Sequence, residues 1–86
     1  MEIRYTKDSI KFLEKQPKSV VTRIRDAISK LKLNPPEGDI LTMKGYTDGR
    51  KRLRVGTFRI IFRNVTENQV EILIVIDIGN RGDIYK

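Results

Sequence analysis

The hydrophobic positions near the N-terminus predict a strand and then a helix. Ile3 and Tyr5 alternate with polar residues, which is the period-two pattern of a short, half-buried strand. A helix should begin at Lys7 and stop near Pro17, because the residue before a proline disfavours the helical conformation. Its apolar stripe is expected to consist of Ile10 and Leu13, with Phe12 on the flank.

A second helix is predicted to follow, with Pro17 as its first residue. Its apolar residues recur at spacings of three and four and so form one face: Val20, Val21, Ile24, Ala27, Ile28 and Leu31. The turn-forming residues 34–39 (NPPEGD) end this helix, and residues 40–44 form either a strand or an extended connection.

The second half of the chain has the pattern of consecutive strands. Residues 50–55 and 58–63 alternate around Gly56-Thr57, which has the size and the leading glycine of a two-residue type II′ hairpin loop. After a second turn at residues 66–69, the chain is nearly continuous in valine and isoleucine over residues 70–78. Such a run predicts a central strand that is buried on both faces.

These elements predict an α+β fold in one domain that spans residues 1–86. We expect an N-terminal strand, a two-helix hairpin, and then three to four antiparallel strands. The strands should form one twisted sheet with both helices on the same face.

Charge narrows the classes of function. The chain has 18 Lys and Arg against 11 Asp and Glu, a formal net charge of +7, which favours a polyanionic partner. No apolar segment approaches the roughly 20 residues of a membrane span, and no signal-peptide pattern opens the chain, so we expect a soluble, cytoplasmic protein without a membrane role. Cysteine and histidine are absent, which excludes disulfides, thiolate nucleophiles, zinc sites and imidazole catalysis.

The first candidate site is a row of arginines. Arg50, Arg52 and Arg54 share one face of the predicted strand, spaced about 6.6 to 6.8 Å apart, close to the phosphate spacing of an extended nucleic acid strand. The alternative is a solvated outer face without a ligand, and the sequence leaves the two interpretations level.

Arg59 belongs to the same candidate site. It follows the hairpin turn closely, so it should stand near Arg54 or Arg52 on the neighbouring strand. Like charges at that spacing repel one another unless an anion joins them. The alternative interpretation pairs Arg59 with Glu71 or Asp77.

Arg81 and Tyr85 lie four residues apart near the C-terminus, where one helical turn would bring them together. A phenol beside a guanidinium can stack on a base while the cation holds a phosphate. The alternative is an aromatic side chain that anchors the chain end to the core. The sequence contains no phosphate-binding glycine loop, dinucleotide motif or metal-ligand cluster, so we expect no cofactor and no metal.

Three segments together resemble the RelE/ParE family of bacterial and archaeal toxins: MKGY (43–46), RLRVGTFRIIF (52–62) and VIDIGNRGDIY (75–85). The resemblance covers essentially the whole chain, and the predicted element order agrees with the fold of that family. It implies a toxin of a type II toxin-antitoxin system. RelE-like members cleave mRNA in the ribosomal A site, whereas ParE-like members inhibit DNA gyrase.

The resemblance also implies roles for individual residues. In the RelE branch a ribose 2′-OH attacks the adjacent phosphate without a metal. Arg59 matches the arginine that stabilises the transition state, Arg81 the residue that protonates the leaving oxygen, and Tyr85 the residue that stacks on the nucleotide. Arg50 and Arg52 stand where some members have lysines that activate the 2′-OH.

Arginine is a poor general base because its pKa exceeds about 12. Arg50 and Arg52 are therefore assigned to holding phosphate and lowering the pKa of the 2′-OH. Arg52 is kept among the catalytic residues. The remaining candidates for binding RNA phosphates are Arg54, Lys44 and Lys51, although strand parity turns Lys51 toward the other face.

Three functions follow from the resemblance. The first is a ribosome-dependent endoribonuclease that inhibits translation, the second a ParE-like gyrase inhibitor, and the third an inactive subunit that acts in antitoxin binding and operon autoregulation. The expected partners are an acidic antitoxin, the ribosome with its mRNA, and operator DNA through the antitoxin.

Overall fold

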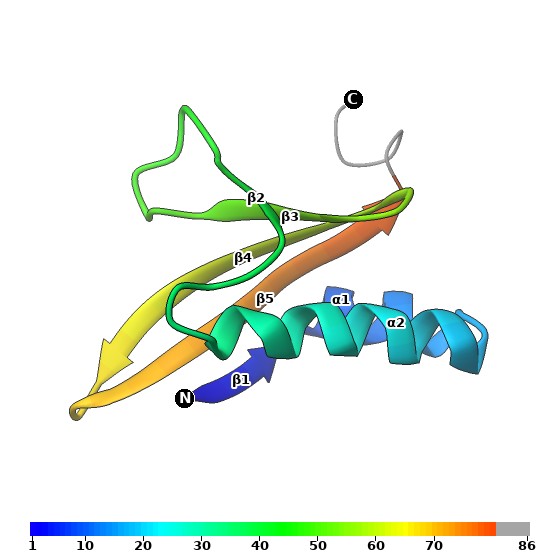
Figure 1. Ribbon diagram of the computed structural model, residues 1–86, viewed down its shortest axis with the longest axis horizontal. Coiled ribbons are helices and arrows are strands. Elements are labelled where there is room, and N and C mark those ends of the chain that lie inside the picture. Colours follow the sequence, from blue (N-terminus) through cyan, green and yellow to red (C-terminus); the bar gives the residue numbers. More distant parts are fainter. Residues whose placement is uncertain (81–86) are drawn as a thin grey trace.

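The computed structural model describes residues 1–80, which fold into a sheet with two helices on one of its faces (Figure 1). In chain order the elements are β1 (Glu2–Tyr5), α1 (Lys7–Glu14), α2 (Lys18–Ser29), the 3-10 turn η1 (Lys30–Lys32), β2 (Asp39–Thr42), β3 (Lys51–Val55), β4 (Phe58–Glu67) and β5 (Val70–Asn80). The strand order across the sheet is β1-β5-β4-β3-β2. The predicted α+β fold is confirmed, and residues 39–42 of the ambiguous segment form a strand.

The sheet is mixed, so the prediction of a wholly antiparallel sheet was wrong in one respect. β1 runs parallel to β5, with Ile3 beside Leu73, while the other three pairings are antiparallel. Along the sequence, two helices lie between β1 and the other strands. The period-two pattern of a strand is the same whether it runs parallel or antiparallel to its neighbour. The alternation of Ile3 and Tyr5 therefore predicts a strand but not its direction.

The start of α1 is fixed to the sheet by hydroxyl groups. Thr6 caps the helix by accepting a hydrogen bond from the backbone N–H of Ser9 (3.3 Å), and its hydroxyl donates to the carbonyl of Ile76 in β5 (2.6 Å). Ser9 is consequently buried, and Phe12 and Leu13 pack against the core. Ile10 is 45% exposed, so its predicted place in the stripe was wrong, because the caps turn the Ser9 side of the helix inward.

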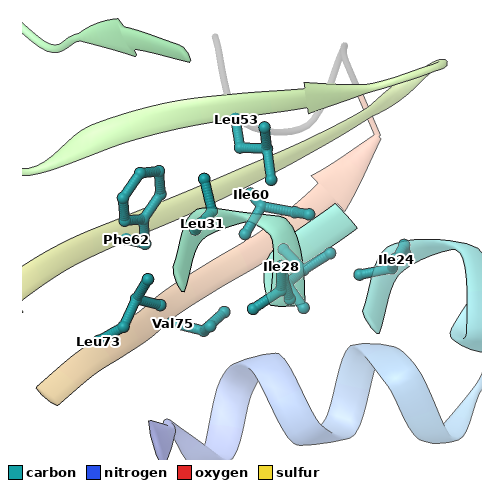
Figure 2. Packing of buried hydrophobic residues seen from close by; sticks show 9 residues of the cluster. Ile24, Ile28, Leu31, Leu53, Ile60, Phe62, Leu73 and Val75 are labelled. Atoms are coloured by element: carbon teal, nitrogen blue, oxygen red, sulfur yellow. The ribbon is translucent and has the colours of Figure 1, made fainter. Parts of the chain in front are cut away.

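The core lies between α2 and the sheet (Figure 2). Ile24 and Ile28 of α2 and Leu31 of η1 pack against side chains from β3, β4 and β5: Leu53, Ile60, Phe62, Leu73, Val75 and Ile78. Pro17 is the N-terminal cap of α2 rather than its first helical residue, since its ψ of 153° is extended. Within residues 1–80, neither helix is long and apolar enough to cross a membrane.

The β3–β4 hairpin sets the register of the candidate site. Gly56 has a φ of +60° and Thr57 does not share the positive φ, as a type II′ turn requires. Val55 is therefore opposite Phe58, Arg54 opposite Arg59, and Leu53 opposite Ile60. The second hairpin turns at Asn68 and Gln69, within the predicted turn.

Candidate phosphate-binding site

Arginines from two adjacent strands lie on the face of the sheet that is turned away from the helices. Leu53 and Ile60 point into the core, so their neighbours Arg52, Arg54 and Arg59 point to the opposite face. We refer to these three residues as the arginine cluster. The register places Arg54 directly opposite Arg59 and so decides between the two cross-strand neighbours that the sequence allowed.

Two members of the cluster are buried to a degree that is rare for arginine. Arg52 is 6% exposed and Arg59 is 5% exposed. Arg52 donates from Nη2 to Oδ1 of Asp39 at 3.2 Å, but its buried Nε has no hydrogen-bond partner within residues 1–80. An unsatisfied buried donor costs about 1 to 3 kcal/mol, so this N–H favours an incoming acceptor.

Asp39 of β2 is an acidic partner of two members of the cluster. It lies opposite Arg54, and its Oδ2 is 3.5 Å from Nε of Arg54. One carboxylate therefore serves both Arg52 and Arg54, and the Asp39 side chain is itself 54% exposed. Arg54 is the exposed member of the cluster, with 44% of its side chain accessible, so it presents positive charge to an anion in solvent.

The alternative acidic partners of Arg59 differ in their distance from it. Gly79 is the residue of β5 opposite Arg59, and Glu71 lies eight residues before it, about 26 Å along the strand. An ion pair with Glu71 is thereby excluded. Asp77 lies opposite Ile61, and its carboxylate accepts a hydrogen bond from the backbone N–H of Ile78 (3.0 Å).

Arg50 does not continue the row of Arg52 and Arg54 in the way that the spacing suggested. It precedes β3, and Asp48 accepts hydrogen bonds from its Nε (3.1 Å) and its Nη2 (2.7 Å). The guanidinium carbon also lies 4.3 Å from the centroid of the Tyr46 ring. These hydrogen bonds lower the pKa of the Asp48 carboxyl to about 2 and raise the pKa of Arg50. Arg50 is thus already paired with an acid.

The remaining predicted residues are placed as follows. Lys51 lies opposite Phe62, which faces the core, so its parity turns it away from the arginine cluster. Lys44 is exposed just after β2. Arg81 and Tyr85 lie outside the described residues, and their roles stay predictions.

The sequence reasoning missed the acids that accompany the arginines. Asp39 closes a turn cluster and Asp48 stands in a loop, and neither position alone indicates an arginine partner. A short separation from a guanidinium was the available signal for Asp48, which is two residues from Arg50. Within residues 1–80 no group of three acidic, histidine or cysteine side chains is arranged to hold a metal ion.

The chain was compared with known families and solved structures. A family model described as the ParE toxin of type II toxin-antitoxin system, parDE, matches residues 3–85. The YoeB/ParE toxin from Agrobacterium tumefaciens has a similar fold, with a TM-score of 0.75 at 23% identity, over 93% of this chain and 98% of that one. No curated protein sequence matches the chain.

Two archaeal structures are also similar. The RelE-RelB complex from Pyrococcus horikoshii gives a TM-score of 0.71 at 22% identity, over 95% of this chain and 96% of that one. The RelB-RelE antitoxin-toxin complex from Methanococcus jannaschii gives a TM-score of 0.70 at 25% identity, over 95% and 94%. The likeness in each case extends over nearly the whole fold.

Proposed function

The chain belongs to the ParE toxin family of type II toxin-antitoxin systems, and we propose that it acts, as RelE-like toxins do, as a ribosome-dependent endoribonuclease that cleaves mRNA. The observation that carries the proposal is the arginine cluster on the face of the sheet that is turned away from the helices. Two of its members are more than nine-tenths buried, and Arg52 holds a buried donor without an acceptor within residues 1–80. A buried donor without an acceptor is costly, so an anionic ligand that accepts from Arg52 would offset that cost.

The proposed reaction is attack of a ribose 2′-OH on the adjacent phosphate. The 2′-oxygen loses its proton and bonds to phosphorus, the bond to the 5′-oxygen breaks, and that oxygen takes up a proton. Arg59 and Arg54 stand opposite each other and would hold the phosphate oxygens as negative charge develops. One preorganised contact of this kind contributes about 3 to 4 kcal/mol to a transition state.

Side chains contribute less to proton transfer than to binding of the phosphate in this reaction. The chain has no histidine, and arginine side chains in general are poor acceptors of a proton. We assign Arg52 to holding the phosphate and lowering the pKa of the 2′-OH, and the distant resemblance assigns Arg81 to the leaving oxygen and Tyr85 to the nucleotide. Alignment of the 2′-OH by the ribosome supplies the remaining acceleration, so free RNA should be cut slowly.

The partners of this toxin follow from its charge and its relatives. The two archaeal neighbours were crystallised with RelB, and a chain with a net charge of +7 attracts an acidic protein. We therefore propose an acidic antitoxin that neutralises the toxin and connects it to operator DNA. The site of action would be the ribosome with its mRNA, in the cytoplasm.

The second candidate is inhibition of DNA gyrase. The family model that matches the chain is named for ParE, and the same basic face could contact a complex of protein and DNA. The third candidate keeps only antitoxin binding and operon repression.

Expression in cells without antitoxin separates these functions. We expect protein synthesis to stop and translated mRNAs to carry new cuts, and we expect Arg59→Ala to abolish both effects. Lys18→Ala, which removes an exposed cation at the start of α2, is the control and should remain toxic. Arrest of replication with trapped gyrase during continued translation would favour the second function, and growth without either effect the third.

A further inference from the structure

The loop between β2 and β3 carries an ordered stack that neither the fold nor the reaction described above uses. Residues 43–50 extend beyond the sheet, away from the helices (Figure 1, green). The loop is closed at its base by a hydrogen bond from the backbone N–H of Met43 to the carbonyl of Arg50 (3.2 Å). At its centre, the Arg50 guanidinium covers the Tyr46 ring with 4.3 Å between the guanidinium carbon and the ring centroid.

Asp48 holds this stack in place. Its carboxylate accepts hydrogen bonds from Nε, Nη2 and the backbone N–H of Arg50, at 2.7 to 3.1 Å. The arginine can therefore not swing away from Tyr46 without breaking several hydrogen bonds. Because its charge is already matched by Asp48, Arg50 offers a planar surface more readily than a free cation for phosphate.

Packing of the fold does not account for the tyrosine. Tyr46 is 49% exposed and is not among the side chains of the core. The loop turns through Gly45 and Gly49, which have φ values of +87° and +75°, and a Cβ at either position would meet no atom within 4 Å. The shape of the loop thus comes from its backbone, and the exposed ring is left available for a ligand.

We infer that Tyr46, Asp48 and Arg50 form a platform on which a nucleobase of the RNA stacks, next to the phosphate held by the arginine cluster. This inference rests on the proposed function. Arg50 lies four residues from Arg54, or about 13 Å along the strand. Extended single-stranded RNA covers that length with about two nucleotides, so the platform meets the base about two positions from the reacting phosphate.

The chemistry of the platform matches unpaired RNA bases. Such bases stack on aromatic rings and on guanidinium planes, and every base has a face that can do so. A purine offers a larger face than a pyrimidine. The platform therefore positions the RNA and favours a purine at that nucleotide, whereas the arginine cluster binds phosphate without regard to sequence.

The test is the distribution of cuts on a translated mRNA in a purified translation system. Wild-type protein should prefer purines about two nucleotides from the cut, and Tyr46→Leu should lose that preference and cut such sites about 10-fold more slowly. Tyr46→Phe keeps the ring and should keep the preference. Asp48→Asn frees Arg50 and should weaken the preference, while Asp26→Asn on α2 makes the same change of charge and should not.

A second readout does not require cleavage. A short RNA with 2-aminopurine loses fluorescence when that base stacks, so wild-type protein and Tyr46→Phe should quench it, and Tyr46→Leu should not. The inference is overturned if Tyr46→Leu retains both the preference and the quenching. If wild-type protein cuts no RNA on ribosomes, the proposed function fails, and the quenching experiment alone then decides whether the platform binds a base.

Discussion

The two faces of the β3–β4 hairpin differ in what their side chains do for the protein. Leu53 and Ile60 form one cross-strand pair and Arg54 and Arg59 form the next, one residue along each strand. The first pair packs against the helices and stabilises the fold. The second places like charges opposite each other, which is destabilising. The hairpin thus combines a face that packs the core with a face of arginines, two of which share the carboxylate of Asp39.

Burial alone does not distinguish the two faces. Ile60 is fully buried, and Arg59 is only 5% exposed. The difference lies in what burial does to the free energy, because a buried methyl group leaves water favourably and a buried guanidinium needs hydrogen-bond acceptors. Asp39 supplies such acceptors to Arg52 and Arg54, from a strand on the edge of the sheet.

The largest change in stability is expected from a substitution on the face of the hairpin that packs against the helices. Ile60→Ala removes a fully buried side chain and leaves a cavity, so it should lower the free energy of unfolding by about 2 to 5 kcal/mol. Urea unfolding followed by circular dichroism measures this loss. A loss below 1 kcal/mol would contradict the assignment of the core to this face.

The next largest change in stability is expected from a substitution of Asp39, and it tests how Asp39 acts on the arginine cluster. Asp39→Asn leaves the buried Arg52 without its carboxylate, which should cost about 1 to 2 kcal/mol of stability, since half of the Asp39 side chain is solvated. The same change should strengthen RNA binding at low salt, because it raises the positive charge of the cluster. Asp26→Asn is the matched control for both measurements. Weaker binding by Asp39→Asn would instead give Asp39 a direct part in RNA contact.

The pKa of Asp48, the acid in the loop between β2 and β3, can be tested by titration. Hydrogen bonds from Arg50 lower the pKa of Asp48 to about 2 from 3.8, so the pair stabilises the folded state at neutral pH. That contribution should be complete above about pH 4 and disappear as the pH falls toward 2. NMR titration of the Asp48 carboxyl carbon gives the midpoint, which should move up toward 3.8 in Arg50→Gln. An unchanged midpoint in that variant would show that Arg50 does not cause the shift.

The smallest change in stability is expected from a substitution of Arg54. Arg54→Gln loses a long ion pair with Asp39 but also loses the repulsion from Arg59, so stability should change by less than about 0.5 kcal/mol. Sulfate should raise the melting temperature of the wild-type protein more than that of the variant, because the anion joins the two arginines. An equal response would contradict an anion site at this pair.

Local patterns predicted the hairpin better than the site. Gly56 and the alternation around it predict the turn and place Arg59 near Arg54 or Arg52, and the register in the structure selects Arg54. The parallel β1 and the contact of Asp39 with Arg52 depend on which segments meet in the sheet, and no local pattern records this. The same holds for Ile10, whose exposure follows from hydroxyl contacts between α1 and β5.

The sequence therefore predicted the arginine cluster as a row of positive charges, but it did not predict that Asp39 pairs with two of them. Parity places Arg52 and Arg54 on one face from sequence alone. The carboxylate that the buried Arg52 shares with the exposed Arg54 comes from β2, which the sequence left open as a strand or a connection.

The most direct test of the central claim is cleavage of an mRNA on programmed ribosomes by purified protein. The wild-type protein should cut the RNA and should fail when the nucleotide before the cut carries a 2′-deoxyribose. Arg59→Ala should slow the cut by about 100- to 1000-fold while remaining folded. Cleavage at the wild-type rate by Arg59→Ala, or of the 2′-deoxy substrate, would contradict an arginine cluster that acts on the attack of the 2′-OH.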